Sequence, residues 1–455
     1  MVKKSAPKTL DLTKSGSSPT NCQTIQSLPE RFFRLSIFTQ FYPPDFAATG
    51  QLIEELANHL KHQGMQVKVF TGQPGYAFSK ASAPVKEESG LLYVRRSRTA
   101  RLFPNRIRGK AINGLMFALR SALHLLKPNQ CGDVLLLTTA PPFLPILGYL
   151  AHLLFGIPYI CLLYDLYPDV AVGLGVISDN HWTVKAWDFI NRCTWRKADG
   201  IIVLSSSMRE RIVAKCPEVA DKISVIHSWA NPSWIVPIPK DRNWFAQKHQ
   251  LTEKFTVLYS GNMGRCHDID TILDAAVELR NEPIQFVFIG NGAKRQLCIN
   301  KVNRLGLRNC LFLPYQDKAD LPYSLTACDL SLVSISPGME GLVAPSKLYS
   351  ALAAGRPIAT ICERHSYLRP LISDAHCGAT FDNGDGQGLA EFIRCLAADP
   401  YLVERLGNAG RRYLETHFTP EVISRQYSVV LRRAVMKREV VSISPPQPSI
   451  NSPLS

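Results

Sequence analysis

The sequence lacks the paired cysteines and Cys/His clusters that stabilise small secreted proteins and zinc-dependent proteins. Its 12 cysteines stand singly among 455 residues, with no CxxC pair and no Cys/His run at zinc-ligand spacing. The first 30 residues lack the apolar core of a signal peptide, so we expect reduced thiols in a cytoplasmic protein. Glycine (28) and proline (31) do not reach the levels of a collagen-like or repeat-linker architecture, which excludes both.

Acidic residues are outnumbered by basic ones, 37 against 52, so the formal net charge is +15. Most of this excess falls before Asn231, and its densest run comprises Arg95, Arg96, Arg98, Arg101, Arg106, Arg108 and Lys110. Such a run suits an anionic membrane or a nucleic acid, or it is an ordinary solvated surface. Nucleic acid is the least favoured, because the run has no interleaved aromatics and no recognition motif accompanies it.

One apolar run is long enough to span a bilayer. Residues 143–163 carry no formal charge over 21 positions. Gly156 and Pro158 interrupt the run, and its last part, 159–163, has the continuous apolar pattern of a buried parallel strand. We therefore predict a helix, a turn and a strand rather than a membrane span. A helix that touches a membrane surface is also expected here, beside the mixed apolar and basic segment 111–127.

Strands and helices alternate along most of the chain, which predicts parallel sheets covered by helices. The fold class is therefore α/β, with two doubly wound Rossmann-like domains that face each other across a cleft and bind ligands at the carboxyl ends of their strands. The predicted boundaries are a disordered leader at 1–30, a first domain at 31–228, a linker at 229–254, a second domain at 255–417, a final helix at 418–438 and a disordered tail at 439–455.

Three turns after predicted strands combine small residues with polar ones. The turn 43–50 brings backbone amides to a helix N-terminus, where an anion can bind, although every doubly wound sheet has such turns. The turn 260–265, SGNMGR, has two glycines and a cation and suggests a diphosphate cradle. Asp268 and Asp270 fit the first turn of the next helix better than a metal site. The turn 289–292 is a tight turn rather than a dinucleotide fingerprint, because the third glycine is missing.

The most informative stretch is 336–358, SPGMEGLVAPSKLYSALAAGRPI. A glycine-bearing loop carries Glu340, whose carboxylate can accept hydrogen bonds from sugar hydroxyls. Ser346 and Lys347 then open a helix, and a helix N-terminus with a lysine suits phosphate. In the first domain, Asp165 follows a buried strand in LLYDLYPD. Its carboxylate either faces the same cleft or caps the next helix.

Taken in this order, the segments resemble the retaining GT-B glycosyltransferases of family 4, which assemble bacterial capsule, O-antigen and exopolysaccharide sugars. The resemblance runs from about residue 33 to 437, and it implies a nucleotide-diphosphate sugar of UDP or GDP type on the second domain and an acceptor on the first. It also identifies 418–438 as a helix that crosses back onto the first domain, with Thr419 as its cap and Pro420 in its first turn. The matching segments are TQFYPPDFAATG, LLYDLYPD, YSGNMG, FVFIGNG and EGLVAPSKLYSALAAGRPI.

The resemblance also assigns donor-binding residues. It places Gly50 in a first-domain loop that closes on the donor phosphates, and Gly261 and Asn262 in the glycine turn of the second domain. The family commonly has an arginine directly after that glycine and a lysine five residues later, whereas this chain has Asn262 and His267. Arg265, with Lys347 and the adjacent Ser346, is therefore predicted to bind the diphosphate.

Of the two family glutamates, the chain keeps Glu340, the predicted sugar-binding carboxylate. The position before ALAAG holds Ser350 in place of the second glutamate, which binds ribose in the family. The resemblance implies transfer with retention of configuration and with no metal or other cofactor, where the departing phosphate accepts the acceptor's proton. Asp165 would orient the acceptor hydroxyl or stabilise oxocarbenium character.

Acceptors in this family are often linked to undecaprenyl diphosphate. We therefore predict a cytoplasmic protein that docks peripherally on the anionic inner face of the plasma membrane, with Arg95, Arg96 and Arg98 on the docking side. Two alternatives stay open: a nucleotide-sugar epimerase of GT-B fold, and a non-catalytic sugar-nucleotide binder or scaffold in a polysaccharide assembly complex.

Overall fold

The computed structural model describes residues 33–45, 47–74, 83–97, 107–127 and 131–443. At 107–108, 110–111 and 437–443 it describes the backbone alone. The predicted leader at 1–30, most of the predicted tail and Arg98 lie outside the described residues.

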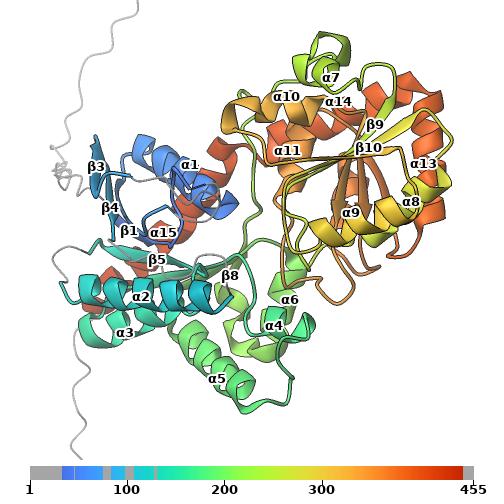
Figure 1. The fold of residues 1–455 in the computed structure, drawn as a ribbon. Helices are drawn as coiled ribbons and strands as arrows, with labels where there is room; N and C mark the ends of the chain where they lie inside the picture. Colours follow the sequence, from blue (N-terminus) through green and yellow to red (C-terminus); the bar gives the residue numbers. More distant parts are fainter. Residues whose placement is uncertain (1–32, 46, 75–82, 98–106, 128–130, 444–455) are drawn as a thin grey trace, which may run out of the picture. The chain divides into compact units, whose positions relative to one another are not determined.

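The first domain is built on an eight-stranded sheet of order β3-β4-β2-β1-β5-β6-β7-β8, which Figure 1 shows in blue to green. All its pairs are parallel except β3 with β4. The central strands β5 and β6 are buried at every position, as expected where both faces are covered. The strands are β1 (Arg34–Phe38), β2 (Gln66–Thr71), β3 (Lys86–Ser89), β4 (Leu92–Arg96), β5 (Val134–Thr138), β6 (Tyr159–Leu163), β7 (Gly200–Val203) and β8 (Ile223–Val225).

The run 143–163 folds as predicted, into α3, a turn at Gly156 and strand β6. Gly156 has φ +63°, a left-handed conformation that glycine adopts without a Cβ penalty, and its N–H donates to the carbonyl of His152 to end the helix. In the described ranges, no helix is both long enough and apolar enough to cross a membrane. The first-domain helices are α1 (Ala48–His62), α2 (Ile107–Leu125), α3 (Pro145–Phe155), α4 (Asp169–Gly173), α5 (Trp182–Lys197) and α6 (Ser206–Lys215).

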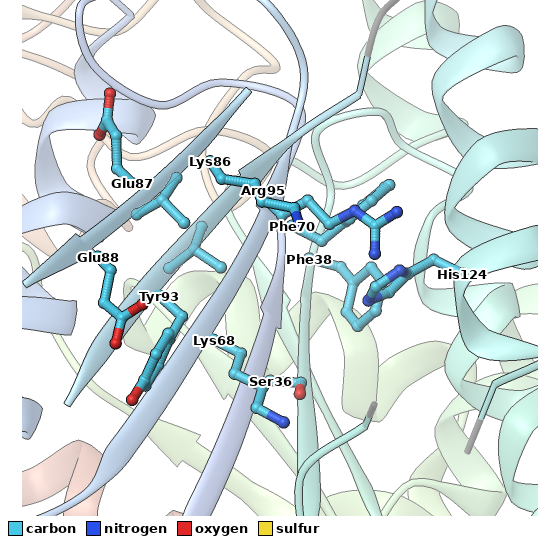
Figure 2. Close-up of a pocket in the computed structure, with 12 residues that line it drawn as sticks. Ser36, Phe38, Lys68, Phe70, Lys86, Glu87, Glu88, Tyr93, Arg95 and His124 are labelled. Atoms are coloured by element: carbon cyan, nitrogen blue, oxygen red, sulfur yellow. The ribbon is translucent and has the colours of Figure 1, made fainter. Parts of the chain in front are cut away.

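Helices cover both faces of this sheet. α3 packs on the Tyr159 side of β6, since a Cβ at Gly148 would lie 2.7 Å from the Tyr159 ring. The last helix, α15, covers the opposite face, where Val430 and Ile160 both lie against Gly200. α3 contacts both α2 and α5. Beside α2, part of the sheet lines a pocket, which Figure 2 shows.

The second domain has a six-stranded, all-parallel sheet of order β11-β10-β9-β12-β13-β14. The predicted α/β class with two Rossmann-like domains is thus confirmed. The strands are β9 (Phe255–Ser260), β10 (Ile284–Ile289), β11 (Cys310–Leu313), β12 (Leu330–Ser334), β13 (Ile358–Ile361) and β14 (Gly378–Phe381). The helices from the linker onward are α7 (Trp244–Lys248), α8 (Asp270–Glu278), α9 (Arg295–Arg304), α10 (Leu321–Thr326), α11 (Lys347–Ala353), α12 (Leu368–Ala375), α13 (Gly386–Ala398), α14 (Pro400–His417) and α15 (Pro420–Ile443).

The final helix α15 crosses back to the first domain, where it contacts α1, β5 and β6. Its predicted cap is present, because Thr419 Oγ1 accepts a hydrogen bond from the Val422 N–H at 3.3 Å. The helix extends to Ile443, five residues past the predicted end at 438.

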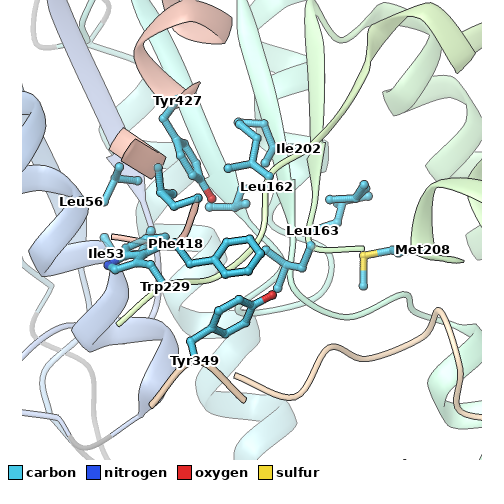
Figure 3. Packing of buried hydrophobic residues seen from close by; sticks show 14 of the residues in the cluster. Ile53, Leu56, Leu162, Leu163, Ile202, Met208, Trp229, Tyr349, Phe418 and Tyr427 are labelled. Atoms are coloured by element: carbon cyan, nitrogen blue, oxygen red, sulfur yellow. The ribbon is translucent and has the colours of Figure 1, made fainter. Parts of the chain in front are cut away.

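An aromatic cluster joins the linker, α11 and α15 to the first domain (Figure 3). Trp229 of the linker meets Tyr427 of α15 edge-on at 6.2 Å between ring centroids, and its indole N–H donates to Glu55 on α1. Tyr349 of α11 meets Phe418 edge-on at 5.1 Å. Since Tyr349 lies two residues after Lys347, this packing holds the helix that carries Lys347 against the first-domain core.

Candidate active site

Asp165 lies just past the carboxyl end of β6 and touches the second domain. Its backbone pairs with Val343 in an isolated antiparallel bridge, and the next N–H, of Leu166, donates to the Leu342 carbonyl at 3.0 Å. Thr139 Oγ1 accepts from the N–H groups of Tyr164 and Asp165. Burial raises the pKa of the Asp165 carboxyl to about 6. The predicted carboxylate therefore stands beside the loop that carries Glu340.

Glu340 is almost completely buried, with 1% of its surface exposed. Neither carboxylate oxygen has a hydrogen-bond partner among the described residues. Its backbone carbonyl is held in place by Arg211 of α6, whose Nε donates at 3.0 Å. The next residue, Gly341, has φ +73° and passes so close to Ser207 that a Cβ there would lie 2.7 Å from the Ser207 carbonyl oxygen. These contacts fix the backbone at Glu340. Its two carboxylate oxygens have no hydrogen-bond donor among the described residues, so donors of a ligand can bind to them.

Lys347 is the first residue of α11 and reaches back to β9. Its ammonium donates to the hydroxyl of Tyr259 and lies 3.9 Å from the centre of the same ring. Tyr259 is fully buried, and its hydroxyl donates to the Asn262 carbonyl at 2.9 Å. Burial lowers the pKa of Lys347 to about 7. No carboxylate in the described part of the chain forms an ion pair with it, so its charge is available to an anion.

Two glycine turns of the second domain interlock next to Lys347. The Gly261 N–H donates to the Ile289 carbonyl, and the Met263 N–H to the Asn291 carbonyl, each at 2.8 Å. A Cβ at Gly290 would lie 2.1 Å from the Gly261 carbonyl oxygen, so only glycine fits there. The turn 289–292 thus supports the turn 260–265, as predicted for a tight turn. Lys347 Cε would be 3.4 Å from a Cβ at Gly261, which confirms that the predicted cation and the predicted turn are neighbours.

Within this turn, the two predicted polar residues point outward. Asn262 and Arg265 are exposed. His267, at the family's lysine position, is partly buried, and its Nδ1 lies 2.9 Å from the Ser334 carbonyl. Burial, and then the nearby Lys347 charge, lower the pKa of His267 to about 3, so this ring is neutral at physiological pH. The charged side chains next to this turn therefore include Arg265 and Lys347, and Lys294, whose ammonium donates to the His267 carbonyl at 2.7 Å.

Cys266, directly after this turn, lies near enough to Asp165 to be affected by its charge. Burial first, and then the charge of Asp165, raise the pKa of the Cys266 thiol to about 11. Asp268 caps α8, since its carboxylate accepts from the Thr271 N–H at 3.1 Å and from Asn383 at 2.8 Å. Asp270 is the first residue of α8, as predicted, whereas Asp268 lies two residues before it, outside the helix. Across the ranges that the structure describes, no group of three or more His, Cys, Asp or Glu side chains could hold a metal ion.

Comparison with known proteins fits this geometry. A family model described as "Glycosyl transferase 4-like domain" matches residues 48–229, and one described as "Glycosyl transferases group 1" matches residues 240–413. Each covers most of one Rossmann-like domain. The chain is a GT-B glycosyltransferase.

Relatives of this glycosyltransferase carry the same assignment. WbjE of Pseudomonas aeruginosa, named as a probable glycosyltransferase, is 24% identical over 340 residues, which cover 74% of this chain and 83% of WbjE. WcaI of Escherichia coli K12, whose name assigns it to colanic acid biosynthesis, is 24% identical over 411 residues, or 85% and 96% of the two chains.

Solved structures share its fold. A sucrose-phosphate synthase from Thermosynechococcus elongatus superposes with a TM-score of 0.70 at 18% identity, over 90% of this chain and 100% of the other. Anabaena HepE in complex with UDP-glucose gives a TM-score of 0.64 at 15% identity, over 88% and 99%.

In the glycosyltransferase, two predicted donor residues have surroundings that the sequence did not indicate. Gly50 was placed in a loop, but it lies inside the first turn of α1, where a Cβ would be 3.0 Å from the backbone of Phe41 and Tyr42. Its absent side chain lets the helix pack on the preceding segment. Ser346 occupies the N-cap position of α11, but its side chain makes no capping hydrogen bond.

The prediction of Arg96 as an exposed docking residue was wrong. Arg96 is 2% exposed, because β4 turns it inward. Its guanidinium pairs with Glu87 at 2.7 Å and donates to the carbonyls of Pro43 and Pro84 at 2.6 and 3.0 Å. It therefore ties β3 and the segment before α1 to the sheet. Arg95, its neighbour on the opposite face, is exposed.

Tyr259 and Arg211 were not singled out from the sequence. Tyr259 looks like an ordinary core residue of a strand, and its position directly before the SG turn was the available signal. Arg211 lies on α6 of the first domain, far in sequence from the loop it supports, so no local pattern could have connected it with Glu340.

Proposed function

We propose that this glycosyltransferase moves a sugar from a UDP- or GDP-type nucleotide sugar onto a polysaccharide precursor, with retention of configuration. The observation that carries the proposal is Glu340, a buried carboxylate with two unpartnered oxygens. It shares a loop with Lys347, a cation that no described carboxylate neutralises. A sugar diphosphate presents hydroxyl donors to the one and negative charge to the other.

Each residue then has a distinct role. Lys347 and Arg265 stabilise the departing diphosphate, where negative charge develops in the transition state. Glu340 accepts hydrogen bonds from the transferred sugar. Asp165, which lies near Cys266 directly after the turn with Arg265, orients the acceptor hydroxyl or stabilises the developing positive charge on the sugar, while the leaving phosphate takes the acceptor's proton. The UDP-glucose complex of HepE supports the donor class.

Calorimetry with UDP, GDP, ADP and dTDP on the full chain tests the donor site. We expect one nucleotide to bind tightly, and the matching nucleotide sugar to be consumed only when a glycan acceptor is present. Glu340→Gln should keep the nucleotide affinity but lower turnover about 10²-fold, because a hydrogen bond to the reacting sugar is weakened. Glu363→Gln, which removes a carboxylate that already has the Gly338 N–H as partner, is the matched control.

Three outcomes would contradict the proposal. Conversion of the donor alone into a new nucleotide sugar would identify an epimerase. Nucleotide binding with no turnover on any glycan acceptor would identify a scaffold. No binding of any nucleotide at millimolar concentration would remove the donor site altogether.

We also propose that the acceptor is a lipid-linked glycan and that the enzyme docks on an anionic membrane. The names of WcaI, for colanic acid, and of LpsD from Rhizobium meliloti, for lipopolysaccharide core, support a glycan of the cell envelope. α2 exposes an apolar row at helical spacing, with 42–62% of each side chain in solvent, and α3 and α5 add further exposed apolar residues. The row comprises Ile112, Leu115, Leu119 and Leu123 of α2, and Leu126 directly after the helix.

Co-sedimentation with phosphatidylcholine vesicles containing phosphatidylglycerol tests the docking. The double variant Leu119→Ser, Leu123→Ser should bind about tenfold more weakly, because two leucines no longer leave water. Leu297→Ser, at an exposed leucine of α9 in the second domain, should bind as the wild type does. Added salt should also weaken binding. Equal sedimentation of the wild type and the double variant would exclude α2 as the docking face.

A further inference from the structure

A pocket of about 420 Å³ lies on the first domain, and its lining contains no residue assigned to the candidate active site (Figure 2). Its volume is in the range of small-molecule sites. Four strands and α2 build it, and nothing in the proposed transfer reaction uses it. The lining residues are Ser36, Phe38, Lys68, Val69, Phe70, Lys86, Glu87, Glu88, Tyr93, Val94, Arg95 and His124.

Strand register places eight of these residues in two rows across one face of the sheet. Every second residue of a strand shares a face. One row therefore consists of the cross-strand neighbours Ser36, Lys68, Tyr93 and Glu88, and the other of Phe38, Phe70, Arg95 and Lys86. The rows run from a central strand to the sheet edge.

The inner part of the pocket is aromatic. The His124 ring of α2 stacks on Phe70 with 4.5 Å between centroids and lies 6.0 Å from Phe38. Burial first, and then the charges of Arg95, Lys127 and Lys68, lower the pKa of His124 to about 4, so its ring is uncharged at neutral pH. This end of the pocket therefore offers an apolar surface.

The outer part carries an excess of positive charge. Three cations, Lys68, Lys86 and Arg95, line it together with two carboxylates. The Glu87 carboxylate is neutralised by Arg96, 2.7 Å away on the other side of β4. The pocket thus joins an aromatic floor to a cationic rim, a combination that suits a molecule with an apolar part and an anionic group.

We propose that this pocket binds an anionic membrane lipid, with its phosphate on Lys86 and Arg95 and the adjoining chain against the aromatic floor. A lipid is selected over a soluble anion because α2, which lines the pocket with His124, also carries the exposed apolar row on its other face, so the proposed docking brings a membrane to the helix that bounds the pocket. The inference rests on the proposed membrane docking. The pocket would make membrane docking depend on the lipid headgroup, whereas the apolar row of α2 does not distinguish one headgroup from another.

Calorimetry with short-chain, non-micellar lipids tests the site on the full chain. We expect dihexanoyl phosphatidylglycerol to bind, and dihexanoyl phosphatidylcholine to bind at least about tenfold more weakly. Lys86→Glu and Arg95→Glu, each at an exposed position, should weaken phosphatidylglycerol binding about tenfold or more. Arg304→Glu, which makes the same charge change on an exposed residue of α9, should leave it unchanged.

Competition with inorganic phosphate and a separate nucleotide titration distinguish failure of the pocket proposal from failure of the proposed function. Inorganic phosphate that displaces the lipid at equal concentration would overturn the lipid assignment, as would equal affinity for the two headgroups or unchanged binding in both variants. Nucleotide binding is titrated on the same samples. Its presence without lipid binding would overturn the pocket alone, whereas its absence would count against the proposed function instead.

Discussion

Asp165→Asn should lower turnover about 10²–10³-fold while nucleotide affinity stays within about threefold of the wild-type value. The variant keeps the shape and the backbone bridge to Val343 but removes the negative charge that lies near Cys266, directly after the glycine turn. That charge acts on the reacting sugar or acceptor and not on the diphosphate, so kcat changes and donor binding does not. Asp169→Asn, in the same motif but paired with Lys215 at 2.8 Å, should retain most of the activity.

The pH profile gives a second readout of the same residue. Burial raises the pKa of Asp165 to about 6, so the carboxylate is lost as the pH falls through this value. Turnover of the wild type should therefore decline below about pH 6, and this acidic limb should be absent from Asp165→Asn. Unchanged turnover in the variant would remove Asp165 from the reaction. The same acidic limb in both proteins would assign it to another group.

Lys347→Met should weaken nucleotide-diphosphate binding about 10–100-fold at pH 6.5, because a charge-assisted contact to phosphate is lost. The methionine keeps an unbranched apolar stem against Tyr259, so packing around the fully buried ring is retained. Lys248→Met is the matched control, since that lysine also lies over an aromatic ring, Trp244, but on α7. Wild-type affinity in Lys347→Met would show that the diphosphate binds elsewhere.

Lys347 should also make nucleotide binding depend on pH. Its pKa is lowered to about 7 in the free protein, and a bound anion favours the charged form and raises the pKa again. Binding above pH 7 then takes up a proton, and affinity falls by up to about tenfold per pH unit as the pH rises. Calorimetry in buffers of different ionisation enthalpy measures this uptake. Lys347→Met is the control for protonation of the nucleotide phosphate. Proton uptake linked to Lys347 should be absent from this variant, whereas uptake by the nucleotide should remain.

The sequence alone was sufficient to predict those features of the structure that depend on neighbouring residues in the chain. The split of 143–163 into helix, turn and strand follows from Gly156 and Pro158. The cap at Thr419 and the place of Asp270 in the first turn of α8 follow from helix chemistry at adjacent residues. The proximity of Lys347 to Gly261 agrees with the donor-binding role that the family resemblance implied for both.

Features set by contacts distant in sequence were not accessible in this way. Arg96 alternates with an exposed Arg95, and its inward position follows from the carbonyls of Pro43 and Pro84, which only the folded chain supplies. The segment around Gly50 has the small residues of a phosphate-binding loop. Glycine is needed there, however, because a Cβ would lie 3.0 Å from the backbone of Phe41. The hydrogen bond that Lys347 donates to Tyr259 joins helix α11 to strand β9, which comes much earlier in the sequence. No local pattern around a strand tyrosine predicts such a contact.

The return of α15 to the first domain has a consequence for how the protein is made. The ribosome completes the strands β1–β8 long before it adds the helix that covers β5 and β6. Until α15 has been synthesised, the apolar face that Val430 later covers is open to chaperones or to premature association. The second domain has all its strands and its own helices by His417, so it can fold while the first domain still waits for its final layer.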